Sequence, residues 1–293
     1  MVGALAAQSV RNDLRPTAEE IAHMREKARM VRLETIRLIQ LPKIGHFSSV
    51  FSCAEIFSSL YYGVMSLKEG DPTWADRDRF TYGKGHAAVG HYPILTDKGF
   101  LPKEVLDEYC KLGNPLGDHP DMTKVPGIDF SSGSIGHALS NGLGIAMGGR
   151  MQGKDFTVFA MMGDGEMQEG QVWEAATAAV SYKVSNLIAI VDNNKYQLDG
   201  AVKAVNDIGD IAGKWRAFGF ETHEVDGHNL EELTLLLRQL KADKSRTVPA
   251  CVIANTVKGK GIEMMENQTG WHLGYLMPED SEIAALEIMS KEI

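Results

Sequence analysis

Three absences limit what the 293-residue sequence can be. Cysteine is scarce: Cys53, Cys110 and Cys251 lie far apart, are odd in number and form no CxxC pair, so a disulfide framework is not expected. The segment from Met1 to Arg15 lacks the basic start of a signal peptide. No apolar run approaches the length that spans a bilayer. We therefore expect a soluble protein of the reducing cytoplasm.

Positive charge is also in short supply. The chain has 30 lysines and arginines against 39 acidic residues, which gives a net charge of -9. Nucleic acids and anionic membranes are usually bound by a basic stripe, and none stands out, so neither is an expected partner. A few local cations could still hold substrate phosphates. Hydrophobic residues make up 44% of the chain, which is enough to bury a large core in one α/β domain.

The N-terminal half opens with a strong helix signal. Thr17 and Glu20 form a capping-box pattern, and Pro42 ends the helix that follows. Residues recur at helical spacing in between, at Ile21, Met24, Ala28, Val31, Thr35 and Leu38. A second helix is predicted over residues 51–62. Residues 70–130, dense in Gly, Pro, Asp and His, are predicted to be rich in loops.

The second half alternates between apolar strands and helices. Helices are predicted over 137–151, 169–182, 211–218 and 230–241, and strands over 157–162, 187–191, 221–225 and 249–254, with a short helical tail from Glu279. This alternation predicts a mostly parallel sheet flanked by helices, with right-handed crossovers. No linker divides the chain, so we expect one domain over residues 1–293 with an N-terminal helical extension.

Polar residues follow two of the predicted strands, where ligands bind in parallel sheets. Gly163-Asp164-Gly165 comes after one strand, and Asn194 lies 30 residues beyond Asp164, after the next. A carboxylate, an amide oxygen and the main-chain carbonyl of Tyr196 suit Mg²⁺ or Ca²⁺ if a diphosphate supplies further oxygens. Each turn alone could be an ordinary turn, but the pair after two apolar strands is far more specific.

The same two turns resemble the fingerprint of thiamine diphosphate enzymes. Further motifs, in the same order, are similar to the N-terminal, diphosphate-binding half of the transketolase family. They are Gly45-His46, Tyr82 to Ala87, Gly117 to Pro120, Ser132 to Gly136, Gly163 to Gly170, Asp192 to Gly200 and Val257 to Gly261, with His272 near the end. The resemblance covers nearly the whole chain and implies a thiamine diphosphate-binding α/β domain.

The resemblance also implies roles for individual residues. The metal ligands would be Asp164, Asn194 and the Tyr196 carbonyl. The cofactor-binding residues would be Ser49, Lys84, His86, Gly133, Ser134, Ile135, Asp164, Gly165, Asn194, Lys258 and His272, with Ile135 where the family usually has Leu. The catalytic histidines, which hold sugar hydroxyls or aid proton transfer, would be His46, His119 and His272. Imidazole suits that task because its pKa lies near neutral pH.

Two departures from the family pattern concern the substrate pocket. Phe47-Ser48 replaces a proline often found after the first histidine, and His137 stands where Gln is common. Neither touches the predicted metal site. Donor and acceptor sugars therefore stay open.

The family's pyrimidine-binding and C-terminal domains are expected to be absent from this chain. The resemblance thus implies the N-terminal subunit of a split transketolase, which acts on sugar phosphates in an α2β2 assembly with a C-terminal partner subunit. Glu169 is a candidate for the interface, although a helix N-terminus favours a negative charge in any case. The alternatives are a related enzyme for an unusual sugar phosphate and a non-catalytic cofactor-binding module. A deoxyxylulose phosphate synthase or a nicotinamide dehydrogenase is less favoured, the latter because no GxGxxG opens a helix after a strand.

Overall fold

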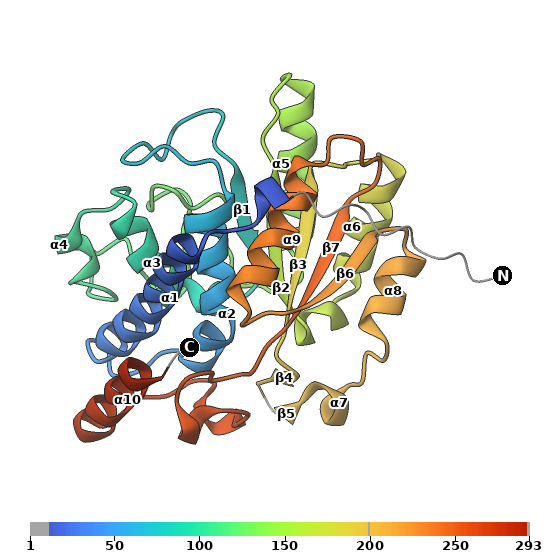
Figure 1. The fold of residues 1–293 in the computed structure, drawn as a ribbon. Helices are drawn as coiled ribbons and strands as arrows, with labels where there is room; N and C mark the ends of the chain where they lie inside the picture. Colours follow the sequence, from blue (N-terminus) through green and yellow to red (C-terminus); the bar gives the residue numbers. More distant parts are fainter. Residues whose placement is uncertain (1–11, 199, 292–293) are drawn as a thin grey trace.

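A five-stranded parallel sheet forms the centre of the computed structural model, which describes residues 12–198 and 200–291 (Figure 1). The strand order is β1-β2-β3-β7-β6. The strands are β1 (Arg79–Tyr82), β2 (Val158–Gly163), β3 (Leu187–Asn193), β6 (Glu221–Asp226) and β7 (Ala250–Asn255). Adjacent pairs are all parallel. This confirms the predicted α/β class with a parallel sheet flanked by helices.

The central strands are apolar up to their carboxyl ends because both faces of the sheet are covered. In β2, Phe159 and Met161 belong to the core on one face, whereas Ala160 and Met162 belong to the core on the other. All six residues of β2 and all seven of β3 are buried. A run without polar alternation is what a doubly covered parallel strand requires.

Two layers of helices cover the sheet (Figure 1). One core includes side chains of α1 (Ala18–Ile39), α2 (Ser48–Ser58), α3 (Ala88–Asp97), α9 (Leu230–Ala242) and α10 (Pro278–Ser290). The other includes side chains of α5 (Ala138–Met151), α6 (Gly170–Ser181) and α8 (Ile211–Ala217). Within residues 12–198 and 200–291, no helix is both long and apolar enough to cross a membrane.

The first helix begins as the sequence predicts. Thr17 Oγ1 accepts the Glu20 N–H, and a Glu20 carboxylate oxygen accepts the Thr17 N–H, so the capping box is complete. The recurring positions are buried at Met24, Ala28 and Val31, and again at Thr35 and Leu38. The helix ends at Ile39, just before Pro42.

The stretch that was predicted to be rich in loops, residues 70–130, also contains helices and a strand. It contains β1, α3 and the short α4 (Lys103–Leu106), none of which the sequence pattern predicts. The second helix also begins at Ser48 rather than residue 51 and continues as a π-helix, η2, over Ser59–Val64. Two small elements, β4 (Tyr196–Gln197) and β5 (Gly200–Ala201), pair beyond the end of β3 and are followed by α7 (Val202–Val205).

Candidate functional site

A cavity of about 270 Å³ opens at the carboxyl ends of the strands. Most of the residues expected to bind cofactor or metal line it, namely Ser49, Lys84, His86, Ile135, Asp164, Gly165, Asn194, Tyr196, Lys258 and His272. The remaining wall is Gly163, Glu166, Gln168, Glu169, Gln197 and Leu198. Residues from more than 200 positions of sequence thus converge on one pocket, where ligand binding is expected in a parallel sheet.

One end of the cavity carries oxygen ligands that the backbone holds in place. Gly163 and Asp192 are neighbours in the β2–β3 register, so Asp164 and Asn194 leave the sheet side by side. Asp164 Oδ1 accepts the Gly165 N–H at 2.9 Å, and its Oδ2 accepts the Lys195 N–H at 2.7 Å. Lys195 itself adopts a left-handed φ of 71°, a conformation that is uncommon for residues other than glycine.

Asn194 completes this set of oxygens. Its Oδ1 accepts the Tyr196 N–H at 3.0 Å, while its Nδ2 lies 3.3 Å from Asp192 Oδ2. Burial and the nearby Asp192 carboxylate raise the pKa of Asp164 to about 6. A bound cation would oppose that rise. One carboxylate, one amide and a carbonyl are hard oxygen donors, which fit Mg²⁺ or Ca²⁺ supplemented by diphosphate oxygens.

This site has too few ligating side chains to hold a metal ion with side chains alone. Among residues 12–198 and 200–291, no group of three or more His, Cys, Asp or Glu side chains could hold a metal ion. Asp164 and Asn194 therefore fit a cation only together with a ligand that brings its own oxygens.

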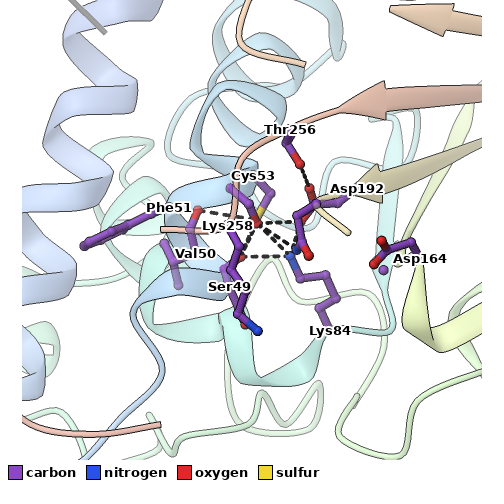
Figure 2. Close-up of polar contacts among 12 residues, drawn as sticks. Ser49, Val50, Phe51, Cys53, Lys84, Asp164, Asp192, Thr256 and Lys258 are labelled. Carbon is purple, nitrogen blue, oxygen red and sulfur yellow. Dashed lines mark hydrogen bonds and ion pairs between the residues drawn. The ribbon is translucent and has the colours of Figure 1, made fainter. Parts of the chain in front are cut away.

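Lys84 forms a buried ion pair beside these oxygens (Figure 2). Its Nζ donates to Asp192 Oδ2 and, at 2.8 Å, to the Ser49 carbonyl. Burial alone would lower the pKa of Lys84, but the Asp192 carboxylate raises it to about 12. Asp192 also accepts hydrogen bonds from Ser52 Oγ at 2.7 Å and from Thr256 Oγ1. Lys84 is thus charged and held by partners within the chain itself.

Lys258 is buried in a different way. The residue is 1% exposed, and its Nζ lies 2.9 Å from Nδ1 of His272. Across the described part of the chain, no carboxylate forms an ion pair with it. Burial and the neighbouring Lys84 cation lower the pKa of Lys258 to about 8, although the charges of Asp164 and Asp192 oppose this shift. A buried ammonium without a direct ion-pair partner is a favourable place for an anion.

Four histidines form a cluster that begins beside Lys258, which His272 contacts. The rings of His46 and His86 have centroids 5.0 Å apart, and those of His86 and His272 are 5.1 Å apart. His119 lies beyond His46, at 6.3 Å between ring centroids. His46 and His119 extend the cluster beyond the residues that line the cavity. The three expected catalytic histidines are therefore brought together.

Burial and neighbouring cations keep two of these rings neutral. Burial and the cation of Lys84 lower the pKa of His86 well below its usual value. Burial and Lys258 lower the pKa of His272 to about 3. Neutral imidazoles can accept as well as donate hydrogen bonds, which suits the binding of hydroxyl groups.

Asp118 sets the environment of the outer pair. Its Oδ1 lies 3.2 Å from Nδ1 of His46, and its Oδ2 lies 3.5 Å from Nδ1 of His119. Burial raises the pKa of Asp118, but the hydrogen bond and charge of His46 lower it below its usual value overall. When Nδ1 of His46 carries a proton and donates it to Asp118, the other ring nitrogen faces away from this carboxylate.

The turn that holds Ile135 lies against the lysine-bearing turn. A Cβ on Gly85 would lie 2.6 Å from the Gly133 backbone nitrogen, so glycine is needed for this close approach. Ile135 lines the cavity, but Gly133 and Ser134 do not. Glu169 lines the cavity and is exposed.

Three acidic residues matter more than the sequence indicated. Asp192 pairs with Lys84, Glu166 is buried in the cavity wall, and Asp118 bonds to His46. Each lies within one of the sequence motifs, but the motifs alone assign it no role. The available signal was position: Asp192 lies at the carboxyl end of an apolar strand, and Glu166 lies in the turn that follows another strand.

Comparison with known proteins decides the family. Residues 23–289 match the model of the transketolase thiamine diphosphate-binding domain. The chain belongs to the transketolase family. This confirms the resemblance, and the domain that matches is one that binds thiamine diphosphate.

Curated relatives include separate subunits and longer chains. An apulose-4-phosphate transketolase subunit of Phocaeicola vulgatus is 35% identical over 89% of this chain and 92% of its own. A 6-deoxy-6-sulfo-D-fructose transketolase subunit of Clostridium sp. is 34% identical over 92% of this chain and 98% of its own. The Mus musculus transketolase is 34% identical, but the match covers only 44% of its length. This member of the transketolase family thus matches nearly the whole length of both subunit relatives.

Solved structures agree on the fold. The Campylobacter jejuni transketolase superimposes with a TM-score of 0.83 at 26% identity, over 94% of this chain and 44% of that one. A Pichia stipitis transketolase gives a TM-score of 0.85 at 24% identity and covers 41% of that chain. The chain spans less than half of these single-chain transketolases.

Proposed function

We propose that this chain is the cofactor-anchoring, N-terminal subunit of a two-subunit transketolase. It would transfer a two-carbon ketol unit between sugar phosphates together with a C-terminal partner subunit. The observation that supports this most is one cavity that brings together oxygen ligands, a buried lysine without an ion-pair partner among the described residues, and a histidine cluster in contact with that lysine. The near-complete match to relatives named as subunits supports the division into two chains.

The oxygen ligands and Lys258 would anchor the diphosphate. Asp164, Asn194 and the Tyr196 carbonyl would hold Mg²⁺ or Ca²⁺ against it, and Gly165 would contact it through the backbone. Lys258 would supply the nearest free cation, and its own burial would be offset by the anion. When bound, thiamine diphosphate supplies the carbon centre at which a bond next to a carbonyl is broken and remade.

The clustered histidines would bind the sugar and exchange protons with it. His272 and His86 are neutral and can accept hydrogen bonds from hydroxyl groups. His46, held by Asp118, can exchange a proton through the ring nitrogen that faces away from the carboxylate. His119 lies at the exposed edge, where a substrate would enter.

A partner subunit would close the site. The cavity is open, and Glu169 is exposed on its wall, so a second chain could cover both. We propose an α2β2 assembly in which Glu169 contacts the partner. The partner would supply the groups that activate the cofactor.

An unusual sugar phosphate is the second candidate substrate. The two subunit relatives are named for apulose-4-phosphate and for a sulfonated deoxyfructose. In this chain the entrance carries the Asp118 carboxylate, which would disfavour an anionic group there and favour a hydroxyl. The phosphate or sulfonate of the substrate would therefore lie away from His119.

Calorimetric titration of thiamine diphosphate with Mg²⁺ tests the first step. The chain should bind the cofactor, and Asp164→Ala should weaken binding at least tenfold because a buried metal ligand is lost. Glu174→Gln, on the exposed side of α6, is the matched control and should bind normally. Binding unchanged by Asp164→Ala would refute the metal site.

A coupled assay tests the second step. Ketol transfer from xylulose 5-phosphate to ribose 5-phosphate should require both this chain and a C-terminal partner subunit. Full turnover by this chain alone would refute the split-site proposal. Cofactor binding with partner-dependent turnover only on apulose-4-phosphate would select the second candidate.

A further inference from the structure

Glu166 is a buried carboxylate in the wall of the cofactor cavity. It lies in η4 (Gly165–Gln168), the turn after β2, and is 4% exposed. No lysine, arginine or histidine forms an ion pair with it anywhere in residues 12–198 and 200–291. Burial raises its pKa to about 7, and hydrogen bonds from Gly136 and Gly163 oppose that rise. Such a group is costly to bury, so these hydrogen bonds must hold it there.

Both carboxylate oxygens of Glu166 accept backbone N–H groups. Oε1 accepts the Gly136 N–H at 2.8 Å, and Oε2 accepts the Gly163 N–H at 3.1 Å. Gly136 ends the turn that includes Ile135 and has a φ of 90°, a conformation that favours glycine. Gly163 ends β2, directly before Asp164. One side chain therefore ties the Ile135 turn to the strand end that carries Asp164.

A third segment is fitted to the same carboxylate. A Cβ on Gly83, at the end of β1, would lie 1.6 Å from Glu166 Oε1. The missing side chain of Gly83 thus leaves the space that the carboxylate fills. Gly83 directly precedes Lys84, so the carboxylate also lies against the turn that carries this lysine.

A carboxylate is the group that this geometry requires. It offers two acceptor oxygens to two donors, whereas the amide of glutamine offers one oxygen and one NH₂ group. With glutamine, an N–H donor would face another donor at either Gly136 or Gly163. One of the two connections would be lost even though the side chain keeps its size.

We propose that Glu166 is a positioning residue that holds the Ser132–Gly136 turn in its cofactor-binding conformation before the cofactor arrives. It acts through Gly136 and Gly163 rather than by chemistry on the substrate. The effect on cofactor affinity rests on the proposed function, but the effect on the turn does not.

Hydrogen exchange of the full chain without cofactor tests the positioning directly. Glu166→Gln should speed exchange at least about tenfold in peptides that contain Gly136, with β3 unchanged, because one hydrogen bond is lost. Thiamine diphosphate with Mg²⁺ should bind about tenfold more weakly, and saturating cofactor should restore slow exchange. Glu174→Gln, the same chemical change on the exposed face of α6, should alter neither.

A double variant separates hydrogen bonding from space filling. Gly83→Ala should displace the carboxylate and weaken cofactor binding as Glu166→Gln does. Gly83→Ala combined with Glu166→Ala gives the new methyl group room. If Glu166 only filled space, the double variant would regain affinity and slow exchange, and the proposal would be overturned. We expect it to stay as weak as Glu166→Ala alone.

The two proposals fail in different ways. Fast exchange of the turn in Glu166→Gln, with no cofactor bound even by the wild-type chain, would refute the proposed function and leave the positioning intact. Normal exchange of the turn in Glu166→Gln would refute the positioning, whatever the chain binds.

Discussion

Lys258 should destabilise this chain when no cofactor is bound. The residue is 1% exposed, and within the described part of the chain its ammonium bonds only to neutral His272. Burial and Lys84 lower its pKa from the usual 10.5 to about 8. A tenfold change in proton affinity corresponds to about 1.4 kcal/mol, so keeping this ammonium charged costs the folded chain about 3 kcal/mol.

Lys258→Met removes the charge and keeps an apolar stem of similar length. The free energy of unfolding without cofactor should rise by about 1–3 kcal/mol, since the lost bond to His272 and imperfect packing offset part of the gain. Urea unfolding at pH 7 measures this. The same variant should bind thiamine diphosphate with Mg²⁺ at least tenfold more weakly by calorimetry, because a buried cation no longer meets the diphosphate.

The lowered pKa of Lys258 fixes the direction in which the stability of the folded chain changes with pH. The pKa of Lys258 is lower in the folded chain than in the unfolded chain, so the unfolded chain binds more protons between pH 8 and 10.5. Stability from this group therefore rises with pH in that window, and the advantage of Lys258→Met should shrink there. Lys260→Met is the control, because Lys260 lies in the same loop, is partly exposed and pairs with Glu266 at 3.9 Å. The reasoning is wrong if Lys258→Met destabilises the cofactor-free chain while cofactor affinity is unchanged.

Three further substitutions test the charges inside the fold. Asp192→Asn leaves the Lys84 ammonium buried without its partner and should cost about 3–5 kcal/mol in urea unfolding. Glu55 bonds Arg32, and although burial raises its pKa, that guanidinium lowers it to about 2. Its stabilisation of about 3 kcal/mol is thus complete above pH 4.5 and is lost as pH falls toward 2, and Glu55→Gln should flatten this dependence. Asp118→Asn should redistribute the tautomers of His46, which ¹⁵N NMR can detect. The same substitution should shift the pH profile of ketol transfer while the affinity for the cofactor stays constant.

Strands were predictable where burial on both faces dominates the sequence. β2, β3 and β7 are apolar up to their carboxyl ends, and their predicted bounds differ from the structure by at most two residues. β1 was missed because it has only four residues, Arg79 to Tyr82, and pairs with β2 alone. Its surroundings are dense in turn-forming residues, so the local pattern gives no strand signal. The sheet edge is fixed by tertiary pairing.

The site was predictable where a rule links sequence position to place. Asp164 and Asn194 follow strands that happen to be neighbours, so strand-end reasoning places them together. Asp192 and Glu166 could not be assigned in this way, because their partners lie far away in sequence. Lys84 is 108 positions from Asp192, and Gly136 is 30 positions from Glu166. A buried charge gains its meaning only from the group that it meets in the fold.

The charges of the cavity also explain why a cation should accompany the cofactor. Lys84 is already neutralised by Asp192, so among the described residues of the wall Lys258 is the ammonium without an ion-pair partner, whereas Asp164, Glu166 and Glu169 are carboxylates. A diphosphate alone would meet the Asp164 carboxylate at close range, where like charges repel strongly in a buried site. A divalent cation between them turns that repulsion into two attractions. Metal and diphosphate should therefore bind cooperatively, with Asp164 as the residue that couples them.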